Sequence, residues 1–421
     1  MPGMDVLPPG ASDAPRPAGP AKPSGTAAHP APPVPASGAE GADADPERLA
    51  VSAGNAAGPL PALHPASAAP VPKRLVEVDD RLTADAAFKL VCEGTALLWR
   101  GDHPGARQLL TAMGRRADRS RPAPAGAARE AFHLHRRAQG RRARLLGMLL
   151  VPLEDGYRVP LGRAPEVREA CEAAYGPYPA HGGPLCVPLR ELTGVVGAYE
   201  WRRKGVPVPA LDSDRVHPHH GVFAPVRGEY VDLVAGAPLP EDRSSAFDIG
   251  TGTGVLAVLL ARRGVGRVVA TDLDARALAC ATENVERLGA ADRVVVESAD
   301  LFPAGRAPLV VCNPPWVPAK PASALERSVY DPGSRMLRGF LVGLPARLTP
   351  GGEGWLVLSD LAEHLGLRTR TELLDLFAAS GLRVLERHDA RPTHPRASDT
   401  EDPLYKARAA EVTSLWRLAA V

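Results

Sequence analysis

The feature that most limits the fold is the alternation of short apolar segments with amphipathic segments after residue 245. Repeated strand, helix, strand order is typical of a parallel sheet with helices on both faces. Ligands of such sheets bind beyond the carboxyl ends of the strands, so we expect functional residues there. The predicted strands are SAFDIG, GRVVATD, RVVVES, APLVVCN, GWLVLSD, LRVLERHD and VTSLWRLA, and the predicted helices lie near 254–263, 275–288, 336–348 and 363–380.

A glycine-rich loop follows the first of these strands. It reads Gly250-Thr251-Gly252-Thr253-Gly254 and leads directly into a predicted helix. Glycines at alternate positions let the backbone turn tightly beneath a ligand and direct the amide hydrogens of the helix start toward it. From Gly252 onward the loop also satisfies the GxGxxG/A fingerprint of dinucleotide binding, which alone is weak evidence for NAD.

Acidic residues stand at the ends of three successive strands. Asp248 lies two residues before the first glycine, and Asp272 ends the second strand, where a carboxylate can accept both hydroxyls of a ribose. Asp300 follows the third strand, where it can accept from an adenine amino group while Leu301 and Phe302 cover the ring. Together these side chains predict a pocket shaped for a nucleoside.

A rigid aromatic corner ends a fourth strand. The apolar run LVVC leads directly into Asn313-Pro314-Pro315-Trp316. A loop that only had to turn would use Gly, Asp or Asn-Gly instead. The stiffness of this corner therefore indicates a function.

The motifs DIGTGTG, ATDLD, SADLF and NPPW, in this order and spacing, resemble class I S-adenosylmethionine-dependent methyltransferases with an [N/D]PP[Y/F/W] motif. The resemblance covers roughly residues 217–421. It is strongest to the release-factor glutamine methyltransferase group, which usually carries Tyr where Trp316 stands, and extends to small-domain adenine methyltransferases. It implies a Rossmann-like, seven-stranded sheet, mostly parallel with an antiparallel last strand, and S-adenosyl-L-methionine as cofactor. The cofactor-binding residues implied are Asp248, Gly250, Thr251, Gly252, Gly254, Asp272, Leu273, Asp300, Leu301 and Asn313.

The same resemblance implies a catalytic role for the corner. The Asn313 side-chain carbonyl and the Pro314 backbone carbonyl would accept the two hydrogens of a planar amide or amino nitrogen, turning its lone pair toward the methyl group. Pro314 and Pro315 would keep these oxygens aimed, because proline fixes φ and has no N–H donor. Trp316 would stack on the plane of the acceptor.

The rest of the chain suggests two further parts. Residues 1–75 are rich in Pro and Ala, which predicts a disordered tail; a Pro-rich ligand for a partner is the alternative. Residues 76–212 form the predicted, mainly helical recognition domain. The helical pattern begins at Val76, and the run from Thr83, which could cap the helix, to Gly101 has apolar residues at helical spacing. Residues 213–421 form the predicted methyltransferase domain.

Charge does not identify the acceptor. The net charge of +2 provides no field that attracts nucleic acid to the whole protein. A local basic run can bind phosphates or an acidic partner, although a solvated helix face explains it as well. A macromolecular acceptor is expected, either a protein such as a translation factor, which is slightly favoured, or RNA or DNA. A non-methylating NAD-binding protein is the alternative from a different class. The basic run contains Arg136, Arg137, Arg141, Arg142 and Arg144.

Cysteine usage and hydropathy indicate the compartment. Five scattered cysteines without CxxC spacing argue against a disulfide framework and against a zinc site, so no metal is expected. No stretch approaches 18 apolar residues, and the N-terminus has no basic start followed by an apolar run. We therefore expect a cytoplasmic protein with no membrane partner.

Overall fold

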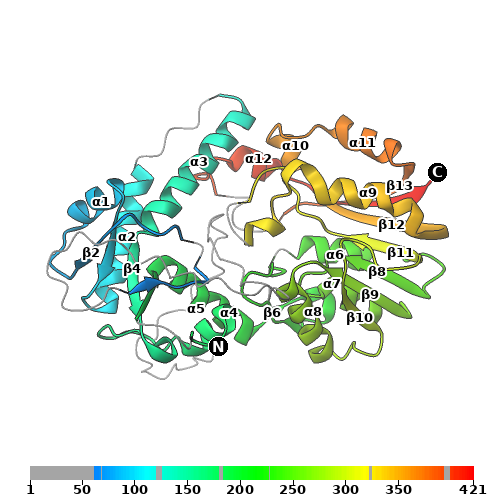
Figure 1. The fold of residues 1–421 in the computed structure, drawn as a ribbon. Coiled ribbons are helices and arrows are strands. Elements are labelled where there is room, and N and C mark those ends of the chain that lie inside the picture. The colour runs from blue at the N-terminus through cyan, green and yellow to red at the C-terminus, as the bar shows by residue number, and fades with distance from the viewer. Residues whose placement is uncertain are drawn as a thin grey trace, which may run out of the picture.

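The structure is a computed structural model, and it shows two sheet-containing domains joined by a short hairpin (Figure 1). None of the helices in its described ranges is both long and apolar enough to cross a bilayer. Most of the predicted tail lies outside these ranges. The described residues are 61–67, 69–119, 126–179, 184–226, 228–321, 325–392 and 399–421.

The C-terminal domain is built on a seven-stranded sheet in the order β10-β9-β8-β11-β12-β14-β13. Only β14 runs against its neighbours, since it pairs antiparallel with both β12 and β13. This confirms the expected Rossmann-like sheet, mostly parallel with an antiparallel last strand. The strands are β8 (Ser245–Ile249), β9 (Arg267–Asp272), β10 (Val294–Ser298), β11 (Ala307–Cys312), β12 (Leu348–Ser359), β13 (Leu382–Ala390) and β14 (Thr413–Ala420).

Helices cover both faces of this sheet. On one face α6 and α7 share a buried cluster with the strands, and α9 and α11 share a second cluster on the other face. The helix predicted over 363–380 is interrupted, because Gly366 takes a φ of 66° and Thr369 starts a new helix with a capping box. The helices are α6 (Glu229–Gly236), α7 (Val255–Arg262), α8 (Ala275–Arg287), α9 (Arg335–Arg347), α10 (Leu361–His364), α11 (Arg370–Ala379) and α12 (Tyr405–Ala410).

The strand order reverses at β8. The chain adds β9 and β10 on one side of β8 and then returns to place β11 on the other side. Both β9 and β11 pair parallel with β8, so the carboxyl ends of all three strands lie at the same edge. In open α/β sheets a reversal of this kind marks the usual ligand-binding edge, because the connections leave toward opposite faces. This edge is where the predicted motifs meet.

The N-terminal domain contains a five-stranded sheet in the order β1-β5-β4-β3-β2. Most of its regular residues are helical, as expected, but the sequence did not predict the sheet. The strands are β1 (Ala62–Leu63), β2 (Arg74–Val78), β3 (Thr95–Trp99), β4 (Leu149–Leu153) and β5 (Leu185–Pro188), and the helices are α1 (Ala84–Cys92), α2 (His103–Arg119), α3 (Ala128–Leu146), α4 (Arg168–Tyr175) and α5 (Leu189–Lys204). A hairpin of β6 (Val206–Pro207) and β7 (Arg215–Val216) follows.

Two predictions for this domain are wrong. The helix that starts at Thr83 ends at Cys92, and Thr95–Trp99 is a fully buried strand between β2 and β4. A short apolar run buried on both faces has no period that separates strand from helix. The tail was also predicted to extend to residue 75, yet β1 pairs with β5 and β2 begins at Arg74. Composition does not reveal pairing with strands so far along the chain.

Packing against the sheet predicts that two nearby residues of α9 contribute differently to the free energy of unfolding. Phe340 is fully buried in the cluster beneath β11 and β12, whereas Val342 is 72% exposed. We expect Phe340→Ala to lower the free energy of unfolding by about 3–5 kcal/mol, because it removes buried contacts and leaves a cavity. Val342→Ala, the matched control, should change it by less than about 0.5 kcal/mol. Urea unfolding measures both variants, and equal losses would contradict the assigned packing.

Candidate active site

The buried carboxylate of Asp248 organises the glycine loop. It accepts a hydrogen bond from the Thr251 hydroxyl at 2.6 Å and another from the Ala257 amide in α7 at 3.1 Å. Burial raises the pKa of Asp248 to about 6, although both hydrogen bonds oppose the shift. The carboxylate therefore joins the end of β8 to the start of α7 and fixes the loop between them.

Each of the three loop glycines takes a positive φ, which side chains other than glycine rarely adopt. A Cβ at Gly250 would lie 2.5 Å from Met336 Cε, and one at Gly254 would lie 3.3 Å from Ala281 Cα. A Cβ at Gly252 would meet nothing within 4 Å. The outer glycines thus allow close packing against α9 and α8, while Gly252 borders open space that a ligand can enter.

Asp272 stands at the end of β9, beside this open space. Its Oδ2 accepts from the Gly252 amide at 3.1 Å, and its Oδ1 accepts from the Asp274 amide at 3.0 Å. Burial raises the pKa of Asp272. A carboxylate has about four lone-pair sites, so hydroxyl donors can still bind beside these amides. Leu273, the next residue, is 64% exposed and presents an apolar side chain at the same edge.

The segment after β10 gives a mixed result. Asp300 is exposed beyond the strand, as a hydrogen-bond acceptor for a ligand must be. Leu301 is half-buried with a φ of 70°, and its carbonyl accepts from the Thr271 hydroxyl at 2.6 Å. The Phe302 ring stacks on Phe340 in α9 with centroids 5.8 Å apart. These apolar side chains pack against α9, and their role as a cover for an adenine ring stays a prediction.

The corner after β11 is held by a contact that the sequence analysis did not include. The Trp316 indole N–H donates to Asn313 Oδ1 at 2.8 Å. Because an indole nitrogen only donates, this bond fixes which side of the Asn313 carboxamide carries the oxygen. The second lone pair of that oxygen remains available. Tyrosine has no donor at the equivalent ring position, which gives a physical reason for tryptophan here.

Trp316 is also packed from several directions. Its half-buried ring contacts the apolar clusters on both faces of the sheet and a third cluster beneath α3. The ring therefore anchors the corner, and the predicted stacking on an acceptor stays a prediction.

Cys312, one residue before the corner, is fully buried, and burial raises its pKa, which keeps this thiol neutral.

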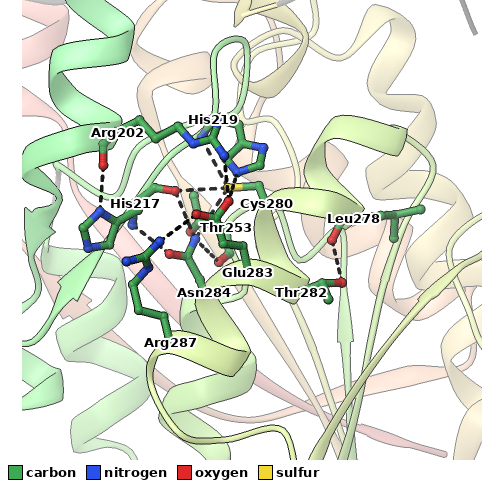
Figure 2. Close-up of polar contacts among 10 residues, drawn as sticks. All are labelled: Arg202, His217, His219, Thr253, Leu278, Cys280, Thr282, Glu283, Asn284 and Arg287. Carbon is green, nitrogen blue, oxygen red and sulfur yellow. Dashed lines mark hydrogen bonds and ion pairs between the residues drawn. The ribbon is translucent and has the colours of Figure 1, made fainter. Parts of the chain in front are cut away.

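A second hydrogen-bond network, which the sequence analysis missed, connects α8 to the glycine loop (Figure 2). The buried Asn284 side chain in α8 donates to the Thr253 carbonyl at 3.1 Å and accepts from the His217 amide at 2.8 Å. Its neighbour Glu283 accepts from Arg202 at 2.8 Å and bonds the ring of His219 at 2.6 Å. The network thus connects α5 of the N-terminal domain to α8 and the loop.

The charge of Glu283 is strongly stabilised in this network. Burial alone would raise its pKa, but hydrogen bonds from His219, Arg287 and Arg202 outweigh burial and hold the pKa of Glu283 at about 2. The carboxylate therefore remains ionised at any pH well above 2. A sequence signal was present only as Glu283 and Arg287, spaced as a helical ion pair.

The raised pKa of Asp248 predicts a pH dependence. A carboxyl whose pKa is about 6 in the folded protein and 3.8 in the unfolded chain binds its proton more tightly when folded, so its contribution to stability rises as the pH falls below 6. Lowering the pH from 7 to 5 should stabilise wild type relative to Asp248→Asn by about 1.4 kcal/mol. Urea unfolding of both proteins at the two pH values measures this change. A difference that stays constant with pH would contradict it.

Comparison with known proteins supports the resemblance read from the motifs. A family model described as ribosomal protein L11 methyltransferase (PrmA) matches residues 237–326. The chain is 36% identical over 162 residues to a release factor glutamine methyltransferase of Cereibacter sphaeroides, covering 33% of this chain and 58% of the relative. It is 51% identical over 71 residues to a ribosomal protein L11 methyltransferase of Pelotomaculum thermopropionicum, covering 16% of this chain and 23% of the relative.

Among solved structures, a ribosomal protein L11 methylase from Lactobacillus delbrueckii subsp. bulgaricus aligns with a TM-score of 0.33 and 16% identity, covering 50% of this chain and 86% of that chain. The chain spans less than two thirds of the length of either sequence relative. The similarity to release factor glutamine methyltransferases is confirmed, and the region from 237 to 326, which holds the glycine loop and the corner, is also similar to ribosomal protein L11 methyltransferases.

Proposed function

We propose that this protein is an S-adenosylmethionine-dependent methyltransferase that methylates a planar amide nitrogen, with a glutamine side chain of a protein as the favoured acceptor. One observation carries the proposal. The Asp272 carboxylate and the Asn313 carboxamide end two strands, β9 and β11, that flank β8 where the strand order reverses. A carboxylate suited to ribose hydroxyls and a carboxamide suited to an acceptor amide therefore lie at the same sheet edge.

The residues present fit the cofactor. Gly252 borders open space at the start of α7, the Asp272 carboxylate lies beside it for ribose hydroxyls, and Asp300 is exposed for an adenine amino group. Bound S-adenosylmethionine would supply a methyl group on a sulfonium, whose departing thioether is neutral and needs no acid. The acceptor nitrogen, on gaining the methyl group, would release one of its two hydrogens as a proton to water. The protein's remaining task is to hold the acceptor nitrogen in line with that methyl group.

Asn313 and Pro314 perform this task in the proposed mechanism. Asn313 Oδ1 and the Pro314 carbonyl each accept a hydrogen bond from one N–H of the acceptor NH₂ group. The lone pair of the nitrogen then points toward the methyl group. The Trp316 indole donates to Oδ1 at 2.8 Å and holds it in place, so the Asn313 side chain loses little conformational entropy when the acceptor binds. Catalysis by orientation alone can recover roughly 7–11 kcal/mol of a barrier.

The names of the relatives favour a protein acceptor. Besides the release factor glutamine methyltransferases, the chain is 33% identical over 141 residues to a ribosomal protein uL3 glutamine methyltransferase of Bordetella pertussis. The relatives so named act on components of translation, which is in keeping with the predicted cytoplasmic location. Both the acceptor and the location are proposals for this chain.

Methylation of an adenine amino group in RNA or DNA is the second candidate, and one observation favours it. The N-terminal part from 61 to 212 carries 23 Lys and Arg against 16 Asp and Glu, a net charge of +7. An open groove along α2 is lined by Arg107, Arg115 and Arg163. Basic grooves of this kind bind phosphates. Nuclease treatment separates the two candidates, since label on RNA or DNA disappears from the polymer and label on protein persists.

The corner residue Asn313 gives the test of catalysis. We expect Asn313→Ala to lower methyl transfer by at least about 100-fold, because the acceptor loses the oxygen that orients it, while cofactor affinity stays within about twofold. Labelled S-adenosylmethionine and an extract from a strain that lacks this protein provide the assay, and mass spectrometry of the labelled fraction identifies the modified residue. Transfer at the wild-type rate would rule out the proposed role of Asn313.

Asp272 gives the test of cofactor binding and of the NAD alternative. Calorimetry should show heat on adding S-adenosylmethionine to wild type and no heat on adding NAD. Asp272→Ala should weaken S-adenosylmethionine binding by at least about tenfold, because two ribose hydroxyls lose a charged acceptor. Heat with NAD and none with S-adenosylmethionine would favour the dinucleotide-binding alternative.

A further inference from the structure

Helix α3 of the N-terminal domain lies against the loop that follows the Asn313 corner (Figure 1). The two segments are far apart in the sequence, and the matched family region from 237 to 326 does not include α3. The contact has a polar part and an apolar part, which come from the same face of α3. Neither part has a role in the function proposed above.

Arg136 makes the polar part of the contact. Its two terminal nitrogens donate to the two carboxylate oxygens of Glu326, each at 2.9 Å, and one of them also donates to the Lys320 carbonyl at 2.8 Å. The guanidinium carbon lies 4.1 Å from the centre of the Tyr330 ring. One planar side chain thus contacts three residues of the loop.

The Arg136–Glu326 pair is largely shielded from water, with its side chains 16% and 6% exposed. Burial opposes the charge on Arg136, yet Glu326 and Tyr330 hold the pKa of Arg136 above its ordinary value. A fork-to-fork pair of this kind is strongly directional, and lysine cannot reproduce it. Removing Arg136 would take both guanidinium hydrogen bonds from the buried Glu326 carboxylate. The pair therefore fixes Glu326 against α3.

Phe132 makes the apolar part, one helical turn before Arg136. It is almost fully buried, and its ring lies 6.5 Å from the ring of Tyr330. Residues four apart lie on the same face of a helix, so α3 presents Phe132 and Arg136 together. The buried residues around Phe132 are Val317, Leu361, Leu365, Leu404 and Ala407.

A short path of contacts joins this loop to Asn313. The Val317 amide donates to the Val329 carbonyl at 3.1 Å, and the Asp331 amide donates to the Val317 carbonyl at 2.9 Å. Trp316, which precedes Val317, packs on the same apolar cluster as Phe132 and donates to Asn313. A shift of the loop would therefore move the indole that fixes the Asn313 carboxamide.

We propose that Arg136 and Phe132 are positioning residues through which the N-terminal domain sets the acceptor side of the active site. The proposal rests on the proposed function. The acceptor pocket then depends on a domain that the matched family region does not contain. Arg136 belongs to the basic run for which phosphate binding and a solvated face were the alternatives, and its side chain instead holds Glu326.

The test compares Arg136→Ala with Arg137→Ala, the adjacent and exposed arginine on the same helix. Hydrogen exchange should become at least about tenfold faster at the amides of Val317, Tyr330 and Asp331 in Arg136→Ala and stay unchanged in Arg137→Ala. Exchange in β8 and β9 should not change in either variant. Unchanged exchange at those three amides in Arg136→Ala would overturn the proposal.

Activity provides the second readout, with labelled S-adenosylmethionine and the protein fraction of an extract from a strain that lacks this chain. In Arg136→Ala, kcat should fall at least about tenfold while the Kd for S-adenosylmethionine stays within twofold, and Arg136→Lys should restore only part of the rate. Absence of transfer by wild type would mean that the proposed function fails. Transfer by wild type and Arg136→Ala at the same rate would overturn the positioning role alone.

Discussion

The reversal of strand order at β8 is the constraint on which the rest of the site depends. Because β9 and β11 pair parallel with opposite sides of β8, the carboxyl ends of the three strands lie at one edge of the sheet. The loops after them need not contact one another for this to happen. Asp248, Asp272 and Asn313 each stand at one of these ends. Their separations along this edge are therefore set by the parallel register of β9, β8 and β11.

Most of this edge could be predicted from the sequence, because its signals are local. Alternating apolar runs predict the parallel sheet, and alternate glycines after a strand predict the tight loop. The failures have a common cause. Thr95–Trp99 is a strand and not part of a helix, because a run buried on both faces has no diagnostic period. Arg74–Val78 is a strand, neither the end of a tail nor the start of a helix, because it pairs with β3, and composition does not reveal that pairing.

Side-chain contacts across the fold could not be predicted at all. Arg136 and Glu326 are 190 positions apart, and nothing in the sequence around either residue indicates its partner. The bond from Trp316 to Asn313 is different, since the two residues are three positions apart and a donor-only ring next to a carboxamide is visible in the sequence. That bond was missed because the aromatic ring was considered only as a surface for stacking.

The N-terminal domain contacts both halves of the site. Behind the glycine loop, Arg202 of α5 bonds Glu283, whose neighbour Asn284 holds the Thr253 carbonyl (Figure 2). In the segment that follows the corner, Glu326 is bonded by Arg136 of α3. Both contacts are ion pairs: the Arg136 and Glu326 side chains are 16% and 6% exposed, and the Arg202 and Glu283 side chains are 29% and 32% exposed. A rigid rotation of this domain would therefore strain the contacts beside the glycine loop and those beside the corner together, so the domain is coupled to both parts of the proposed site.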